Sequence, residues 1–118
     1  MNKKEVGATW EKTAVEYLAA RGMQILECNF RCRQGEVDII GMHAGVLVFV
    51  EVKYRTGTGM GSALDAVTPV KMRKICKVAM YYRYVKKVFQ DMPIRYDVVA
   101  IQNGEIHWVK NAFLHQYD

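Results

Sequence analysis

The spacing of apolar and polar residues predicts one helix followed by three strands in the first half of the chain. From Thr9 to Arg21 apolar residues recur at helical spacing, and Gly22 suits the left-handed position that ends many helices. Met23 to Phe30, Gly35 to Met42 and Val46 to Tyr54 have the short, β-rich composition of strands.

The second half predicts another helix and a hairpin. Ser62 to Val88 has a helical pattern that is interrupted near Thr68-Pro69, and the main helix can begin there because proline is tolerated in a first turn. Ile94 to Gln102 predicts a fourth strand, and Asn103-Gly104 a two-residue turn into Glu105 to Val109. This order, α-β-β-β-α-β-β, predicts an α/β sandwich with a mixed sheet and at least one crossover helix.

The third predicted strand combines a buried pattern with charged residues. The nearly continuous apolar run from Val46 to Val52 is typical of a central strand that is covered on both faces. Glu51 and Lys53 nevertheless lie near its end, and alternation places them on one face. Buried charges are costly unless they have partners or a metal, so this pair predicts a site.

The preceding strand supplies partners for these charges, provided that the turn between the strands has the right length. Glu36 and Asp38 share one face there, with Val37 and Ile39 on the other. A two-residue turn at Ala44-Gly45 would pair His43 with Val46 and place Asp38 opposite Glu51 and Glu36 opposite Lys53. A four-residue loop would place Glu36 opposite Glu51. A three-residue loop would send the acids and Lys53 to opposite faces unless a bulge intervened.

Two facing carboxylates predict a divalent cation between them. Without one they repel by up to about 1 kcal/mol on a sheet surface. Ligands that are all oxygens and leave positions open suit Mg²⁺ or Mn²⁺, which can polarise a phosphodiester and activate a bound water. Lys53 could then orient or deprotonate that water, or stabilise charge on the phosphate. The alternative is a polar strand end where Glu51 and Lys53 form a local ion pair.

Composition limits the class of protein without defining it. The 118 residues are 51% hydrophobic and 25% charged, which predicts a single folded domain over residues 1–118. No apolar run approaches the roughly 20 residues of a membrane span, and the charged N-terminus lacks a signal core, so we expect a cytoplasmic protein. Cys28, Cys32 and Cys76 form neither a zinc motif nor an even disulfide set, and are expected to be reduced thiols.

The net charge of +5 gains meaning from the second predicted helix. Between Thr68 and Val88 there are seven cations and no acid, namely Lys71, Arg73, Lys74, Lys77, Arg83, Lys86 and Lys87. Because a helix balanced for its own stability would carry acids four residues away, this pattern favours a phosphate-facing surface over a merely solvated one. Arg55, directly before the glycine-rich Thr56 to Gly61, is a candidate phosphate clamp.

The remaining side chains of this helix are expected to divide between core and surface. Apolar side chains at helical spacing form the stripe expected to face the sheet: Met72, Ile75, Cys76, Ala79 and Met80. Tyr81, Tyr82 and Tyr84 could stack on bases, but core or rim packing is the more frequent role of helical tyrosines.

Elsewhere the sequence indicates packing more than chemistry. Arg95 and Asp97 share a face of the fourth strand and predict an internal ion pair. His43, His107 and the remaining histidine lack a nucleophile arrangement and are expected to be surface or packing residues.

Several motifs together resemble one family. They are Gly35-Glu36-Val37-Asp38-Ile39-Ile40, Phe49-Val50-Glu51-Val52-Lys53-Tyr54-Arg55, Trp10-Glu11-Lys12-x-Ala14, Lys71, and Arg95-Tyr96-Asp97-Val98-Val99. This combination resembles the YraN-like family of uncharacterised bacterial proteins, which looks like a branch of the PD-(D/E)xK nuclease superfamily. The resemblance implies the restriction-endonuclease-like fold, a three-layer sandwich similar to that of archaeal Holliday-junction resolvases.

The resemblance also implies a set of roles. Asp38 and Glu51 match the two metal-binding acids, and Lys53 matches the catalytic lysine. Glu11 matches the acid that resolvases place on their first helix, facing the site, and is expected to assist in holding the metal. Val37 departs from the pattern, which expects proline. The implied activity is Mg²⁺- or Mn²⁺-dependent hydrolysis of DNA phosphodiesters, on branched or otherwise structured DNA, by a homodimer. The rival is a nucleic-acid-binding module that keeps the fold with little or no catalysis. In either case the expected nucleic-acid contacts are Arg55, Lys71, Lys74 and Lys77.

Overall fold

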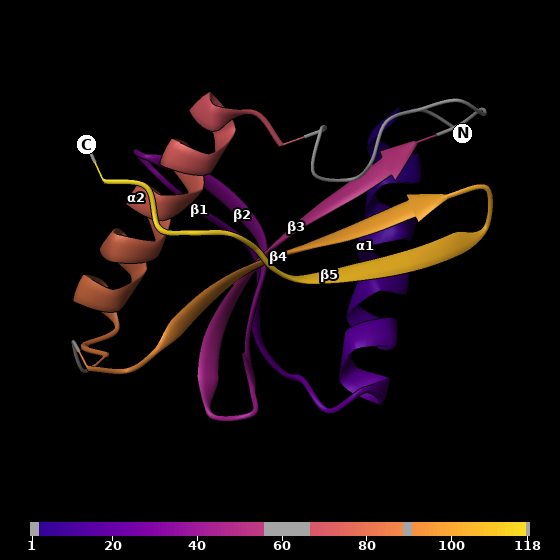
Figure 1. The fold of residues 1–118 in the computed structure, drawn as a ribbon. Coiled ribbons are helices and arrows are strands. Elements are labelled where there is room, and N and C mark those ends of the chain that lie inside the picture. The colour runs from indigo at the N-terminus through magenta and orange to yellow at the C-terminus, as the bar shows by residue number, and fades with distance from the viewer. Residues whose placement is uncertain (1–2, 56–66, 89–90, 118) are drawn as a thin grey trace.

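The computed structural model describes residues 3–55, 67–88 and 91–117, and Figure 1 shows its helices on either side of a twisted sheet. The elements match the predicted order α-β-β-β-α-β-β. They are α1 (Lys3–Ala20), β1 (Gln24–Cys32), β2 (Gly35–His43), β3 (Val46–Arg55), α2 (Pro69–Val85), β4 (Ile94–Gln102) and β5 (Glu105–Phe113).

The sheet is mixed, as predicted, and its strands lie in the order β1-β2-β3-β4-β5. Neighbouring strands are antiparallel except β3 and β4, which pair in parallel from Leu47↔Ile94 to Arg55↔Gln102. A parallel connection needs a crossover, and α2 lies in the chain between these two strands. The predicted crossover helix is therefore confirmed.

Helix α1 begins earlier than predicted and ends where expected. The pattern placed its start at Thr9, but the helix starts at Lys3, and the carbonyl of Thr9 accepts a hydrogen bond from the Thr13 hydroxyl. At the other end the Met23 N–H donates to the Leu18 carbonyl, and Gly22 has φ +97°. This is the closure that a glycine after a helix permits. Within the described residues, neither helix combines the length and apolarity required to cross a membrane.

The turn between β2 and β3, whose length determines which residues of the two strands share a face, has two residues. His43 pairs with Val46, and the residues between them, Ala44 and Gly45, have φ values of +52° and +77°. Positive φ at both positions defines the tight turn that matches the twist of antiparallel strands. The predicted turn at Asn103 and Gly104 has the same conformation, with φ values of +50° and +80°.

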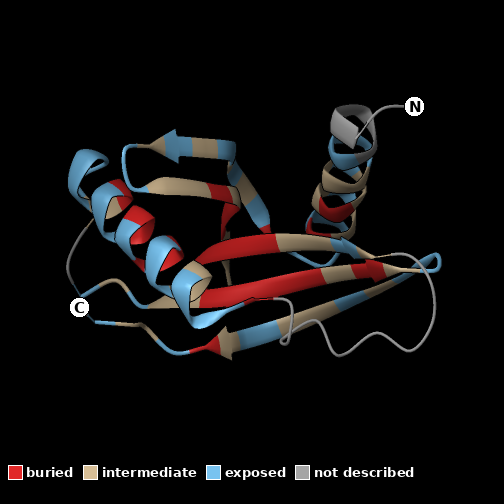
Figure 2. Cartoon of the chain, turned by 90° about the horizontal axis from the view of Figure 1, so that it is seen from above, coloured by how far each residue is buried: buried red, intermediate tan, exposed pale blue. Residues whose placement is uncertain are grey.

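Each face of the sheet carries its own apolar core, and Figure 2 shows the buried residues concentrated in the central strands and the helix faces. Leu47 and Phe49 of β3 pack into the core under α2, while Val48 and Val50 pack into the core under α1. The prediction of a central strand that is buried on both faces is confirmed, and the fold is a helix–sheet–helix sandwich.

Helix α2 begins at the predicted break. The Thr68 hydroxyl accepts a hydrogen bond from the Lys71 N–H, and Pro69 occupies the first turn. Residues 62–66, where the longer alternative helix would begin, lie outside the described residues. One part of the predicted core stripe is wrong: Met80 is 37% exposed, and Val78 and Tyr82 are buried in its place. The buried stripe is centred on Ile75, Val78 and Tyr82, so Met80 lies at its edge.

Candidate metal centre

The candidate site lies where β2 separates from β3. The pairing between these strands runs from the turn as far as Ile39↔Val50 and ends there. Beyond that point the Val52 N–H donates instead to Oδ2 of Asp38, at 2.7 Å. A side chain thus replaces the partner strand, and it satisfies a backbone donor that would otherwise lose its hydrogen bond.

This separation corrects one detail of the sequence interpretation. Val37 and Ile39 were expected on the same face, but Val37 packs into the core under α2 and Ile39 into the core under α1. Regular alternation therefore fails around Asp38, which the sequence pattern could not reveal. The expected partner of Glu36 was Lys53, but Glu36 pairs with Arg31 of β1, at 3.2 Å between Nε and Oε2.

The structure nevertheless brings Asp38 and Glu51 together. Glu51 is 4% exposed, an unusual position for a carboxylate, and its side chain hydrogen-bonds with that of Asp38. Two carboxyl groups can share such a bond only when one of them holds a proton. A cation held between the two acids would take the place of such a shared proton.

Two lysines face Glu51 from different elements. Lys71 of α2 places its Nζ 3.2 Å from Oε2 of Glu51, and Lys53 of β3 places its Nζ 3.7 Å from the same atom. Neither contact has hydrogen-bond geometry, so among the described residues this buried oxygen has charged neighbours but no hydrogen-bond donor. Lys71 was expected on the nucleic-acid surface, but the structure places it in the site.

Burial and the paired acids shift the protonation of Asp38. Removal from water raises its pKa most, and the hydrogen bond and negative charge of Glu51 raise it further, to about 7. The Val52 N–H and the positive charge of Lys71 act in the opposite direction without cancelling this effect. Near neutral pH, Asp38 is thus balanced between its protonated and ionised forms.

Glu11 approaches the site from α1, as the resemblance implied. The pKa of Glu11 is raised, most by burial and next by the negative charge of Asp38, so the two carboxyl groups interact electrostatically. Both line a cavity of about 180 Å³ between α1 and β3. Within the described part of the chain, however, no three acid, histidine or cysteine side chains are close enough to hold one ion. Glu11 thus borders the Asp38–Glu51 pair without joining a ligand cluster.

The donor set fits a hard divalent cation. Oε2 of Glu51 is buried without a donor, and only one Asp38 oxygen accepts the Val52 N–H. Mg²⁺ is usually held by one or two carboxylates and completes its shell with waters and substrate phosphate. Asp38, which lines the cavity, and the adjacent Glu51 would therefore provide the two carboxylates for such an ion.

Three neighbours of the site were not predicted from the sequence. The rings of Trp10 and Tyr54 stack at 4.5 Å with an interplanar angle of 18°, and both line the cavity with Glu11 and Asp38. Asn29, with φ +54°, hydrogen-bonds to the Glu11 side chain. The adjacency of Trp10 to Glu11 and of Tyr54 to Lys53 was a usable signal, whereas nothing in the sequence pointed to Asn29.

The other predicted contacts are spread around the site. Arg55 ends β3, two residues beyond Lys53, and is half-buried. Lys74 and Lys77 are exposed on α2, further along the helix from Lys71. The glycine-rich residues 56–61, to which the clamp prediction for Arg55 also refers, lie outside the described residues.

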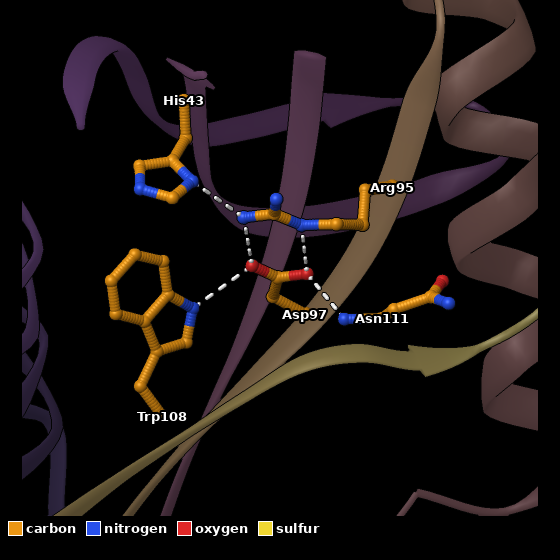
Figure 3. Close-up of polar contacts among 5 residues, drawn as sticks. All are labelled: His43, Arg95, Asp97, Trp108 and Asn111. Atoms are coloured by element: carbon orange, nitrogen blue, oxygen red, sulfur yellow. Dashed lines mark hydrogen bonds and ion pairs between the residues drawn. The ribbon is translucent and has the colours of Figure 1, made fainter. Parts of the chain in front are cut away.

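The predicted ion pair between Arg95 and Asp97 is confirmed as a packing element, shown in Figure 3. The buried Asp97 carboxylate receives two hydrogen bonds from Arg95, one from the Trp108 indole and one from the Asn111 N–H, each 2.9 Å. His43 lies 3.0 Å from Arg95 through Nδ1, and desolvation together with the Arg95 charge lowers its pKa. A neutral His43 that accepts a hydrogen bond from Arg95 agrees with the predicted packing role. Through Trp108 and Asn111, the cluster also connects β5 to β4.

Cys28, Cys32 and Cys76 are free thiols, as expected.

The fold and this site together define a class of protein. It is an α/β sandwich of the restriction-endonuclease-like order, with the buried Glu51, the half-buried Asp38 and two lysines where two strands of its mixed sheet separate. The chain belongs to the uncharacterised protein family UPF0102, whose model matches residues 10–101. The resemblance to the YraN-like family is therefore confirmed.

Relatives from several bacteria extend this match over nearly the whole chain. A UPF0102 protein of Lachnoclostridium phytofermentans is 48% identical over 113 residues, which cover 96% of each chain. One from Alkalilimnicola ehrlichii is 40% identical and covers 92% of this chain and 86% of its own. Another from Shewanella woodyi is 38% identical over 93% of this chain and 92% of its own.

Proposed function

We propose that this protein is a metal-dependent endonuclease that hydrolyses DNA phosphodiesters, with structured or branched DNA as its substrate class. One observation carries the proposal: Glu51 is buried beside Asp38, and its Oε2 faces two lysines but has no hydrogen-bond donor within the described part of the chain. Without a cation this arrangement is costly, because burial and the adjacent Glu51 carboxyl disfavour the ionised form of Asp38. Binding a cation between the two carboxyl groups removes that cost.

Each side chain has a distinct task in this proposal. Asp38 and Glu51 would hold Mg²⁺ or Mn²⁺, and Glu11 would accept hydrogen bonds from waters at the cavity edge. When bound, the cation supplies Lewis acidity toward the phosphodiester and lowers the pKa of a water. Lys53, 29% exposed, has room to turn from Glu51 toward a substrate phosphate and to stabilise its developing charge.

Lys71 supports the same site from the helix. Its positive charge lowers the pKa of Asp38, which favours the ionised form that a cation requires. As a side chain that is 39% exposed, it can also meet a phosphate at the mouth of the site. The exposed Lys74 and Lys77 continue this positive charge along α2, where a DNA backbone would be attracted.

The test compares cleavage and cation binding in matched variants. The unmutated protein, Asp38→Asn and Glu51→Gln are incubated with four-way junction, flap and linear duplex DNA, with Mg²⁺, Mn²⁺ or EDTA. Glu36→Gln is the control, because this acid lies on the same strand and pairs with Arg31 outside the site. Calorimetric titration with Mn²⁺ measures cation binding independently of activity.

We expect cation-dependent cleavage by the unmutated protein and Glu36→Gln, and its loss in the two site variants. Cation and DNA binding without cleavage by the unmutated protein would instead favour the non-catalytic nucleic-acid-binding module. Equal cleavage by Asp38→Asn would reveal a contaminating nuclease and refute the assignment of the site.

A further inference from the structure

A groove of about 630 Å³ runs between α2 and the segment after β5, away from the Asp38–Glu51 pair. Its volume is within the range of ligand sites in proteins. No acidic residue of the described chain lines it, and its most prominent walls are aromatic. They include Tyr81 and Tyr84 of α2 and Tyr117 of the C-terminal segment.

The three tyrosine rings of this groove are accessible, and two of them pack against neighbouring rings. Tyr84 and Tyr117 are 82% and 83% exposed, and Tyr81 is 43% exposed. Tyr81 packs against Phe30, with ring centroids 6.4 Å apart, and Tyr117 packs edge-on against His115 at 4.6 Å. Three large rings open to water along one groove are more than the isolated surface aromatics of an ordinary protein.

The wall formed by the C-terminal segment is fastened to the rest of the fold. The Gln116 N–H donates to Sγ of the buried Cys76, at 3.3 Å. The ring of His115 stacks on Tyr96, which itself stacks on Phe113 at the end of β5. The groove is therefore a built feature, and an incoming ligand need not order it.

Positive charge accompanies these rings on the helix. Lys74, Lys77, Tyr81 and Tyr84 follow the spacing i, i+3, i+7, i+10, which places them along one side of α2. All four are exposed. Lys71, at the start of the same helix, reaches Glu51, so this row leads away from the candidate metal centre. At 1.5 Å per residue, Tyr84 lies about 20 Å along the axis from Lys71, the length of about six nucleotides of one strand.

We infer that this groove binds the unpaired bases of a single-stranded DNA segment next to the cleavage site. Tyr81 and Tyr84 would stack on bases, while Lys74 and Lys77 would meet the phosphates. Aromatic faces combined with cations form the usual recognition surface for single strands, since every base has a face that can stack. The inference rests on the proposed function and sharpens its substrate to DNA that carries a single-stranded branch.

Fluorescence anisotropy in EDTA tests this inference without cleavage. The probes are a fluorescein-labelled blunt duplex and the same duplex with a single-stranded tail of about ten thymidines, within the usual site size of single-strand binders. The variants are Tyr81→Ala, Tyr84→Ala and the corresponding changes to Phe. Tyr17→Ala on α1 is the control for loss of a tyrosine outside the groove. Circular dichroism confirms that each variant is folded.

We expect the tailed duplex to bind at least about tenfold more tightly than the blunt one, and each alanine to weaken only the tailed complex by about tenfold. Phenylalanine, which keeps the stacking face, should retain that affinity, and Tyr17→Ala should leave it unchanged. Equal affinity for both probes, or equal loss on both, would overturn the inference. So would a change from dimer to monomer in the alanine variants, which would identify the groove as an interface between copies.

Cleavage separates the two proposals. A protein that prefers tailed DNA through its tyrosines but never cuts with Mg²⁺ or Mn²⁺ supports the groove and refutes the endonuclease. One that cuts through Asp38 and Glu51 without preferring a tail supports the endonuclease and refutes the groove.

Discussion

Replacing Asp38 with asparagine should stabilise the metal-free protein at alkaline pH. Asparagine has the shape of the protonated acid: its carbonyl can accept the Val52 N–H, and its amide can donate to Glu51. It keeps the hydrogen bonds of the neutral form and cannot acquire the negative charge that the folded site disfavours. The unmutated protein gains that charge as the pH rises.

The size and sign of the effect follow from the pKa of Asp38. The folded state raises it from 3.8 to about 7. Below about pH 4 both folded and unfolded chains hold the proton, so the acid has no effect on stability. Between pH 4 and 7 only the folded chain holds it, so stability falls as pH rises, and the full penalty is present above pH 7. At about 1.4 kcal/mol per pKa unit, the loss of stability caused by ionised Asp38 is at most about 4 kcal/mol. Solvent screening of this half-buried carboxyl reduces the expected loss to about 2 kcal/mol.

The assay is urea denaturation in EDTA at pH 5 and pH 8, comparing the unmutated protein with Asp38→Asn. The pKa values of His43 and His115 are lowered, mainly by burial, which makes stability rise with pH. Neither histidine is among the groups that shift Asp38, so both effects cancel in the difference between the two proteins. We expect the variant to be about 2 kcal/mol more stable at pH 8 and only about 0.7 kcal/mol more stable at pH 5, where little more than a third of the penalty is present.

A variant less stable at pH 8 than the unmutated protein would refute this reasoning. So would a difference in unfolding free energy that is the same at both pH values, because only a titrating group changes its contribution over this range. In either case the acid pair would be stabilised by the fold without a cation, and the main argument for a metal would be lost.

Three further predictions concern the cation, the ion-pair cluster and a packed glycine. Mn²⁺ should raise the melting temperature in differential scanning fluorimetry, more at pH 8 than at pH 5, and Glu51→Gln should abolish the rise; a rise that persists in the variant would place the ion elsewhere. Asp97→Ala should lower the free energy of unfolding by about 3 to 5 kcal/mol in urea titrations, because it leaves Arg95 without its buried partner; a loss below about 1 kcal/mol would contradict this. Gly41→Ala should be strongly destabilising in the same titrations, since a Cβ there would lie 2.8 Å from the Gln24 carbonyl oxygen, whereas Gly7→Ala, with nothing within 4 Å, should be neutral or stabilising.

Local sequence patterns are sufficient to predict the order of helices and strands and the Asp38–Glu51 pair of the candidate site. The two-residue turn at Ala44 and Gly45 fixes the parity of the hairpin, and parity brings Asp38 to Glu51. The pattern of β3, apolar on both faces with Glu51 near its end, is enough to identify a buried charge. These inferences succeed because they depend on residues close together in the chain.

The rest depends on packing between distant segments. Lys71 reaches Glu51 because α2 crosses the sheet as the connection between β3 and β4, and helical spacing alone cannot say which lysine ends beside which strand. The separation of β2 from β3 on the N-terminal side of Ile39 is also not visible in an alternating pattern, since it becomes evident only when Val37 and Ile39 pack into different cores. Met80 lies outside the core for a similar reason: the rotation of α2 about its axis is set by the sheet beneath it.

The stacked pair of Trp10 and Tyr54 has a practical consequence for spectroscopy. The chain contains two tryptophans, and they occupy separate environments: Trp10 borders the cavity of Asp38, while Trp108 donates to Asp97 between β4 and β5. Their fluorescence therefore reports on two different parts of the molecule. A Trp108→Phe variant would leave one emitter beside the acid pair, and Mn²⁺, a paramagnetic quencher, would dim it on binding nearby. The fluorescence of Trp10 would thus report directly on cation binding at the proposed site.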